Sequence, residues 1–427
     1  MIMEKGYSLK ESLVLLVREL NPAGVGNGFV AFLFSTLGPG LIVMNAAKSG
    51  GYTDAQTVSW LLGIYAMGGL GCIYTALRYR QPVSIAFSIP GAIILAGLLK
   101  QYSINEAVGA YFVITAVTLF LTATGMIKKV VEKIPVPIML AMVAGVLVSF
   151  GISLFKGAIT TPSIYGLMVV AYFVTMAFRR FTQVIPPIVV AVVVGVVLLV
   201  LHGKITPVPI ELELAKPELV MPMFSLGAII NIGIPLFLLV VGVQNIQAVG
   251  VLMAEGYKPP INAMYMVPSI ASIVNALIGA HNAVCAGPST AICCSAASGP
   301  RKDLRFIASF SEGVFWFLFA LSAKVAVDAV KVVPAEFAGV LAGLAMFEVF
   351  GSAFKGAFTG QFKSGAMVAF FVCITNQPIF GIASPFWAIV LGVVTSLVVE
   401  RQDFSFGRGG DRTLPEAVDV QEETAAQ

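Results

Sequence analysis

Four long stretches of this chain contain no Asp, Glu, Lys or Arg: residues 181–203, 219–254, 259–300 and 364–399. A helix needs about 20 apolar residues to cross the hydrocarbon core of a bilayer, so each stretch is long enough for at least one crossing. The whole chain of 427 residues has only 26 basic and 22 acidic residues, and 58% of it is hydrophobic. This pattern predicts an all-α membrane protein, and it excludes a nucleic-acid binder, a secreted disulfide scaffold and most soluble enzymes.

Cutting the apolar stretches at charges, Gly and Pro predicts fourteen transmembrane segments. Their approximate limits are 29–47, 57–77, 82–99, 107–127, 135–154, 161–178, 184–202, 226–254, 262–279, 283–299, 306–327, 334–354, 364–377 and 383–399. With the N-terminus in the cytoplasm, most of the 26 basic residues fall on the cytoplasmic side, as the positive-inside rule requires. We therefore expect a multi-pass membrane protein with both termini cytoplasmic.

Two parts of the chain resemble each other. Residues 135–158 align with 334–357, so that Pro135 matches Pro334 and the sequence FKGA at 155–158 matches FKGA at 354–357. After seven spans, an odd number, the chain is on the other side of the membrane. A second copy of seven spans therefore has the opposite orientation. The sequence thus predicts seven plus seven inverted repeats, an arrangement typical of secondary transporters.

Spans three and ten each carry a proline in mid-span, Pro90 and Pro288. Proline favours the first turn of a helix and pushes the preceding residue into an extended conformation. Each span is therefore predicted to be an extended segment followed by a half-helix, although a kinked continuous helix is the alternative. In inverted repeats the two amino-terminal ends would converge on one spot, where N–H groups and helix dipoles suit an anion.

A few polar side chains stand out within the apolar segments. Gln244 and Asn245 on span eight are candidate binding residues, and Asn45 holds the corresponding place in the first repeat. Hydrogen-bonding between helices is the other explanation for such amides. His281 and Glu312 are the candidates for proton coupling, because an ionisable group within the membrane is usually functional. A salt bridge, or a side chain that reaches the membrane surface, is the alternative for each.

Three stretches resemble the benzoate/proton symporter family of bacterial inner-membrane proteins. They are 59–97, with YR-x-P before an S-x-PGA turn; 235–260, with QN before a GY-basic-PP loop; and 279–293, with G-x-H before span ten. The resemblance implies a uracil-permease-type fold and an elevator movement between a core and a gate domain. It also implies a homodimer formed through the gate domain.

The division into domains follows from the resemblance together with the composition of the two ends. An amphipathic cytoplasmic segment is expected at 1–28, a periplasmic linker at 205–225 and a disordered cytoplasmic tail at 401–427. The core domain would comprise spans 1–4 and 8–11 at 29–127 and 226–330. The gate domain would comprise spans 5–7 and 12–14 at 128–204 and 331–400.

Together with these observations, the resemblance implies a proton-coupled symporter of an aromatic carboxylate such as benzoate, with no cofactor, no metal and no enzymatic activity. The sequences of the turns in spans three and ten both differ from those usual in the family. Transport of another small anion, or of a nucleobase, by the same fold is therefore the alternative. A membrane-embedded enzyme would need a catalytic cluster that two histidines on different spans hardly provide. The predicted substrate-binding residues are Asn45, Phe87, Ser88, Ile89, Pro90, Gly91, Gln244, Asn245, Gly287, Pro288, Ser289 and Thr290.

Overall fold

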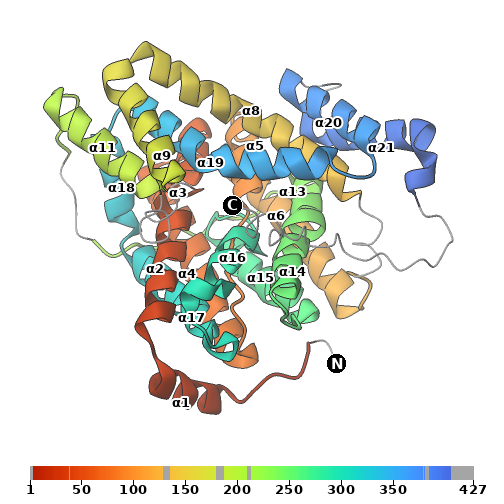
Figure 1. The fold of residues 1–427 in the computed structure, drawn as a ribbon. Helices are drawn as coiled ribbons and strands as arrows, with labels where there is room; N and C mark the ends of the chain where they lie inside the picture. Colours follow the sequence, from red (N-terminus) through yellow and green to blue (C-terminus); the bar gives the residue numbers. More distant parts are fainter. Residues whose placement is uncertain are drawn as a thin grey trace, which may run out of the picture.

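The structure, a computed structural model, describes residues 3–37, 39–127, 135–178, 187–208, 213–377, 379 and 384–404. The described part is mostly helical, with one two-stranded sheet (Figure 1). Its α-helices are α1 (Leu9–Glu19), α2 (Pro22–Leu37), α3 (Pro39–Ser49), α4 (Asp54–Tyr79), α5 (Ile89–Leu98), α6 (Ile104–Ala123), α8 (Val136–Thr160), α9 (Leu167–Ala177), α11 (Pro187–Leu201), α12 (Leu226–Ala228), α13 (Ile234–Leu239), α14 (Asn245–Ala254), α15 (Ile261–Leu277), α16 (Gly287–Cys294), α17 (Phe306–Leu321), α18 (Ala323–Val332), α19 (Ala335–Phe358), α20 (Lys363–Thr375) and α21 (Ser384–Val399). The strands are β1 (Ile85–Phe87) and β2 (Ala283–Cys285), and short turns of π- or 3₁₀-helix connect or extend several helices.

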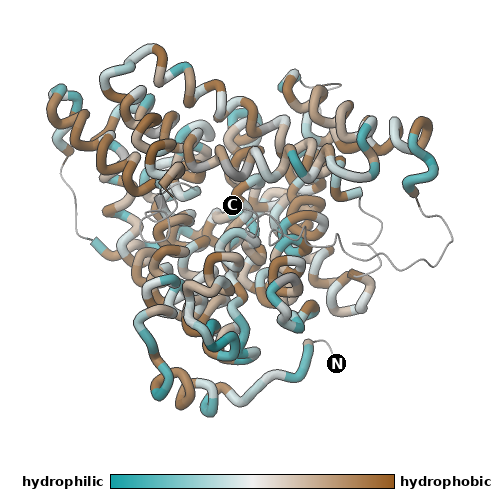
Figure 2. The backbone as a smooth tube through the Cα atoms, in the orientation of Figure 1, coloured by the Kyte–Doolittle hydropathy of each residue, from teal (hydrophilic) through white to brown (hydrophobic). Residues whose placement is uncertain are grey.

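Each predicted span overlaps helix in the structure. Six of the described helical stretches are long and apolar enough to cross a membrane: Pro22–Ser49, Asp54–Tyr79, Ile104–Ala123, Val136–Thr160, Leu226–Met253 and Lys302–Leu321. Shorter apolar helices account for most of the others. In Figure 2 hydrophobic residues dominate the helices, and hydrophilic residues gather at several helix ends and along the N-terminal segment.

Two predicted boundaries are wrong. The first span begins at Pro22 rather than at 29, because the Asn21 side chain accepts a hydrogen bond from the Gly24 N–H at 2.8 Å and starts the helix there. The eleventh span does not run on to 327, because α17 ends at Leu321 and α18 begins at Ala323. In the N-terminal segment, α1 is the amphipathic helix that was expected, with Leu13 and Val17 exposed.

The tail is structured at its start, contrary to the prediction of disorder from 401. A short 3₁₀-helix spans Arg401–Asp403, and the Asp403 carboxylate accepts a hydrogen bond from the Phe362 N–H at 2.7 Å. Phe404 also packs on the Phe362 ring, with centroids 4.8 Å apart. These contacts hold Phe362 at a φ of 60°, which is unusual for a bulky residue. The remainder of the predicted disordered tail, 405–427, lies outside the described residues.

The helices pack in two groups. Helix α8 packs along α19 and α20, and α20 pairs with α21, in the upper part of Figure 1. In the lower part α17 packs against α4 and α2, and α15 packs against α4 and α6. Glycines allow α4 and α17 to cross closely, since a Cβ on Gly69 of α4 would lie 2.5 Å from the Gly313 carbonyl of α17. The strand pair lies within the second group, next to α4 and α15.

Candidate functional site

The two broken spans meet in an antiparallel strand pair, and a half-helix leaves each end of it. Ile85 pairs with Cys285, Ala86 with Val284 and Phe87 with Ala283. Helix α5 follows β1 and helix α16 follows β2, each with its proline in the first turn, as the prolines predict. The two amino-terminal ends therefore point toward the strand pair from opposite sides.

The half-helices do not converge on one spot, which corrects the sequence-based expectation. The ladder between them is three residues long, about 10 Å of extended chain. An anion at this place would meet one helix end directly and the other across the strands. The antiparallel pairing, which the two prolines do not reveal, is the reason for this spacing.

Span eight contributes both of the predicted amides to this strand pair. The Ser88 hydroxyl, which caps α5, donates a hydrogen bond to Gln244 Oε1 at 2.7 Å and accepts one from the Gly91 N–H at 3.0 Å. Asn245 Oδ1 accepts a hydrogen bond from the Cys285 N–H at 2.8 Å. Gln244 is thus hydrogen-bonded to span three, and Asn245 is hydrogen-bonded to span ten.

Several donors at this place have no partner among the described residues. The Asn245 side-chain nitrogen is buried and unpaired. The backbone N–H groups of Ile89, Gly287 and Ser289 also make no hydrogen bond within the described part of the chain. Unpaired buried donors are costly, so they favour a ligand that brings acceptors, such as a carboxylate.

Other predicted binding residues support the strands. Phe87 is buried between Tyr65 and His281, with ring centroids 5.5 Å and 5.7 Å away. Thr290 Oγ1 accepts a hydrogen bond from the Ser84 N–H at 3.2 Å, and the Ser84 carbonyl accepts one from the Ala286 N–H at 2.9 Å. These contacts fix β1 against α16.

The remaining candidates lie at the edge of this arrangement. Asn45 is half-buried on α3, which packs against α5, and no described hydrogen bond joins it to the other candidates. Pro90, Ile93 and Ile94 of α5 form a contact with Val143 of α8 that has no room for a water molecule. Ligand pockets usually exceed roughly 300 Å³, so a bound ring would need α5 and α8 to separate here.

His281 is fully buried, and both of its ring nitrogens have partners. Trp60 Nε1 donates a hydrogen bond to His281 Nδ1 at 2.8 Å, and His281 Nε2 lies 2.9 Å from the Ser88 carbonyl oxygen. The arrangement fits a neutral ring with its proton on Nε2. His281 therefore links α4 to the residue that caps α5.

Glu312 is fully buried on α17, behind the strand pair. Its Oε2 accepts hydrogen bonds from the Ser84 hydroxyl at 2.5 Å and from Cys293 Sγ at 3.4 Å, and its Oε1 has no described partner. Ser289, in the first turn of α16, contacts Ser35 of α2 with hydroxyl oxygens 2.9 Å apart. Glu312 thus touches residues of both broken spans.

The sequence-based reasoning missed several residues that shape this site. Ser84 and Trp60 carry no local signal of a role, because their partners lie far away along the chain, and the sequence favoured a hydrogen bond between helices for Gln247. A Cβ on Gly287 would meet the Gln247 side chain at 2.7 Å, so Gln247 lies beside the amino end of α16. Its place in the sequence QNIQ was the only available indication.

A family model described as benzoate membrane transport protein matches residues 18–398. The chain belongs to this family. Its family and structural neighbours are membrane transporters, so the chain is a membrane transporter of a small anion and not an enzyme.

Two relatives match over nearly their full length. The benzoate membrane transport protein of Acinetobacter baylyi is 30% identical over 373 residues, which cover 87% of this chain and 94% of the relative. The inner membrane protein YdcO of Escherichia coli is 28% identical over 382 residues, covering 88% and 97%. The names of these relatives agree with a bacterial membrane location.

Solved structures with a similar fold are anion transporters. The transmembrane domain of a cyanobacterial bicarbonate transporter, BicA, has a TM-score of 0.60 at 15% identity, covering 92% of this chain and all (100%) of that one. Murine solute carrier 26 family member A9, an anion transporter in the inward-facing state, has a TM-score of 0.59 at 12% identity, covering 92% and 70%. These matches do not support the narrower expectation of a uracil-permease-type fold.

Proposed function

We propose that this protein is a proton-coupled symporter that imports an aromatic carboxylate, benzoate or a close relative, across the bacterial inner membrane. The observation that carries the proposal is the set of unpaired donors at the broken spans, above all the buried Asn245 amide nitrogen. The chain around them, 219–254 and 259–300, has no charged residue that would repel or trap an anion. The name of the Acinetobacter relative indicates benzoate.

In this proposal the carboxylate lies at the amino end of α16. The N–H groups of Gly287 and Ser289 and the side-chain amides of Gln244 and Asn245 would donate to its oxygens. The ring would lie toward Ile89 and Pro90, where the contact with Val143 would have to open. Phe87, Ser88, Gly91 and Thr290 would hold the two backbones in place, and Asn45 would lie at the rim.

The proton would bind Glu312 rather than His281, which is the second candidate. Both His281 nitrogens are already hydrogen-bonded, so protonating Nδ1 would break its bond to Trp60. Glu312 has a free oxygen, and among the described residues no basic group neutralises it. A neutral Glu312 favours an anion bound nearby and an ionised one opposes it, so proton and substrate would bind together.

The finer architecture is also part of the proposal. The fourteen spans would form seven plus seven inverted repeats, with both termini cytoplasmic. The helix group that contains the strand pair would be the core domain, and the group around α8 and α19 would be the gate domain. The core would slide past the gate as an elevator, and the gate would form a homodimer.

The test is uptake of radiolabelled benzoate into proteoliposomes that carry the purified protein. We expect accumulation when the outside is acidic, and none without a pH gradient. Glu312→Gln should remove the effect of the gradient while binding persists, whereas His281→Gln should keep it. Failure of the wild-type protein to accumulate benzoate under any gradient would refute the proposal.

The site is tested by Gln244→Ala and Ser289→Ala. Each loses a group next to the proposed carboxylate, so the Kd for benzoate should rise about fivefold to tenfold, the effect of about 1 kcal/mol or slightly more. Asn231→Ala is the matched control: it removes a buried amide from the same helical stretch, where Asn231 donates to the Tyr102 hydroxyl at 2.7 Å. Equal Kd values in all three variants would place the substrate elsewhere.

A small inorganic anion is the second candidate, because the neighbours in fold include a bicarbonate transporter. The same vesicles distinguish the two. Bicarbonate-dependent charge movement without competition by benzoate would favour the inorganic anion.

A further inference from the structure

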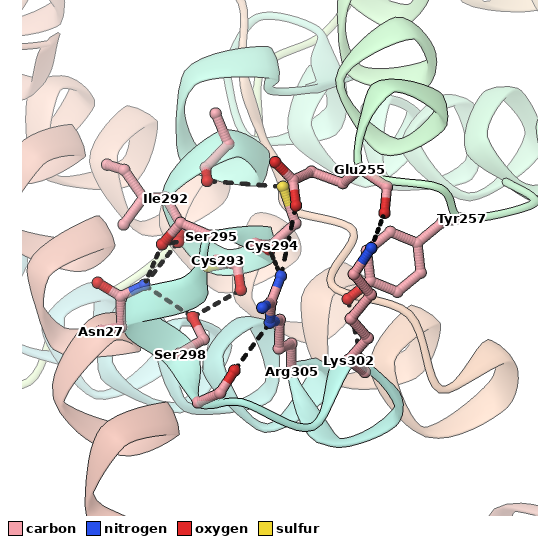
Figure 3. A network of polar contacts seen from close by, with 12 residues as sticks. Asn27, Glu255, Tyr257, Ile292, Cys293, Cys294, Ser295, Ser298, Lys302 and Arg305 are labelled. Atoms are coloured by element: carbon pink, nitrogen blue, oxygen red, sulfur yellow. Dashed lines mark hydrogen bonds and ion pairs between the residues drawn. The ribbon is translucent and has the colours of Figure 1, made fainter. Parts of the chain in front are cut away.

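The carboxyl-terminal end of α16 is held by side chains from three other segments (Figure 3). Asn27 of α2 donates to the Ile292 carbonyl at 2.5 Å, and Ser298 donates to the Cys293 carbonyl at 2.7 Å. Arg305, just before α17, donates through Nη1 to the Cys294 carbonyl at 2.6 Å. The last three carbonyls of this half-helix are therefore all satisfied by side chains.

Arg305 is the only charged group among these three, and it is buried. It is 5% exposed, and its Nε also donates to the Gly299 carbonyl at 3.0 Å. Its ion pair with Glu255, at the end of α14, is long at 3.4 Å, and the Glu255 side chain is 42% exposed. Solvent screens such an exposed partner, so much of the Arg305 charge remains effective toward α16.

A positive charge at this end acts on the opposite end of the same helix. The carboxyl end of a helix carries a partial negative charge, which a cation there neutralises. Helix α16 has only eight residues, so its amino end lies roughly 12 Å away through protein. At that distance and an effective dielectric constant of about 20, a unit charge changes the affinity for an anion about tenfold.

We propose that Arg305 is a positioning residue that sets the anion affinity of the site: it anchors α16 and keeps its amino end electropositive without touching the substrate. This inference rests on the proposed function, since it assumes an anion at Gly287 and Ser289. The unpaired Asn245 amide nitrogen beside β2 is the independent sign of a ligand at that end. Asn27 supplies a second, uncharged anchor for the same helix.

The test is the Kd for benzoate, measured on purified full-length protein in detergent. Arg305→Gln should raise it about fivefold to tenfold, and Arg305→Lys, which keeps the charge, should restore most of the affinity. Lys302→Gln is the matched control, since Lys302 lies three residues away, is exposed and donates to the Glu255 carbonyl at 2.9 Å instead of to α16. Its Kd should stay within twofold of the wild-type value.

Glu255→Gln keeps the experiment decisive if Arg305→Gln does not fold. It removes the negative partner and leaves the Arg305 bonds to α16 in place, so benzoate should bind about twofold more tightly. A purely structural role for Arg305 gives no such gain. Unchanged binding in both Arg305→Gln and Glu255→Gln, or an equal loss in Lys302→Gln, would overturn the inference, whereas a wild-type protein that does not bind benzoate would instead refute the proposed function.

Discussion

At the scale of single residues, the chemistry of the site depends on partners that are distant in the sequence. His281 owes its orientation to Trp60, 221 residues earlier, and to the Ser88 carbonyl, 193 residues earlier. Nothing around His281 in the sequence distinguishes a proton carrier from a structural histidine. The two hydrogen bonds favour the structural role.

Trp60→Phe tests this interpretation of His281. It removes the indole donor and leaves the buried Nδ1 unpaired, which should lower the unfolding free energy by about 1–3 kcal/mol. Trp316→Phe is the control, because Trp316 is equally buried but its Nε1 has no described partner. Thermal unfolding in detergent should show a clearly larger loss for Trp60→Phe, and equal losses would contradict the importance of the bond.

At the scale of elements, the sequence predicts where a helix begins only when the capping residue or proline lies next to that helix in the chain. Pro90 and Pro288 correctly indicate the two half-helices. Helix α20 is different, because its first N–H groups are capped by residues that follow α21. The Glu400 carboxylate accepts hydrogen bonds from the N–H groups of Ser364 at 2.6 Å and Gly365 at 3.1 Å.

Glu400 makes the stability of this element depend on pH. Burial alone would raise the pKa of its carboxyl, but the bonds from Ser364, Gly365 and the Ser396 hydroxyl outweigh burial, so the pKa lies below its ordinary value. The stabilisation is therefore present above the pKa of the unfolded chain, near 4.5, and is lost as the pH falls through the lower folded value.

Glu400→Gln should accordingly lower the unfolding free energy at pH 7 by about 1 kcal/mol. Its difference from wild type should shrink as the pH is lowered below about 4.5, the ordinary glutamate range. The control is Glu336→Gln, since Glu336 lies in the first turn of α19 and makes no hydrogen bond among the described residues. A difference that stays constant from pH 7 to pH 4 would show that the charge of Glu400 is not involved.

At the scale of the whole molecule, the two helix groups meet where α5 faces α8. The contact there is formed by four apolar residues, Pro90, Ile93, Ile94 and Val143. An apolar contact without polar side chains suits two bodies that move past each other, as the elevator proposal requires.

Cross-linking tests that movement. A short bifunctional thiol reagent applied to the variant with Ile94→Cys and Val143→Cys should stop benzoate uptake by joining the two groups. The control variant, with Tyr102→Cys and Asn231→Cys, joins positions within one group, where the native side chains are hydrogen-bonded, and should keep its uptake. Uptake that survives efficient linking of positions 94 and 143 would argue against an elevator movement.

Much of this protein can be predicted from its sequence, because apolar length and proline position act locally. The charge-free runs determined that the chain is a membrane helix protein, and the two prolines determined that spans three and ten are broken. Only the tertiary structure decided that the broken spans pair as strands and that Gln244 and Asn245 each bind one of them. It also decided that Arg305 hydrogen-bonds to the carboxyl-terminal end of α16. Those contacts join segments tens to hundreds of residues apart, and their energies depend on burial and direction, which neither composition nor spacing encodes.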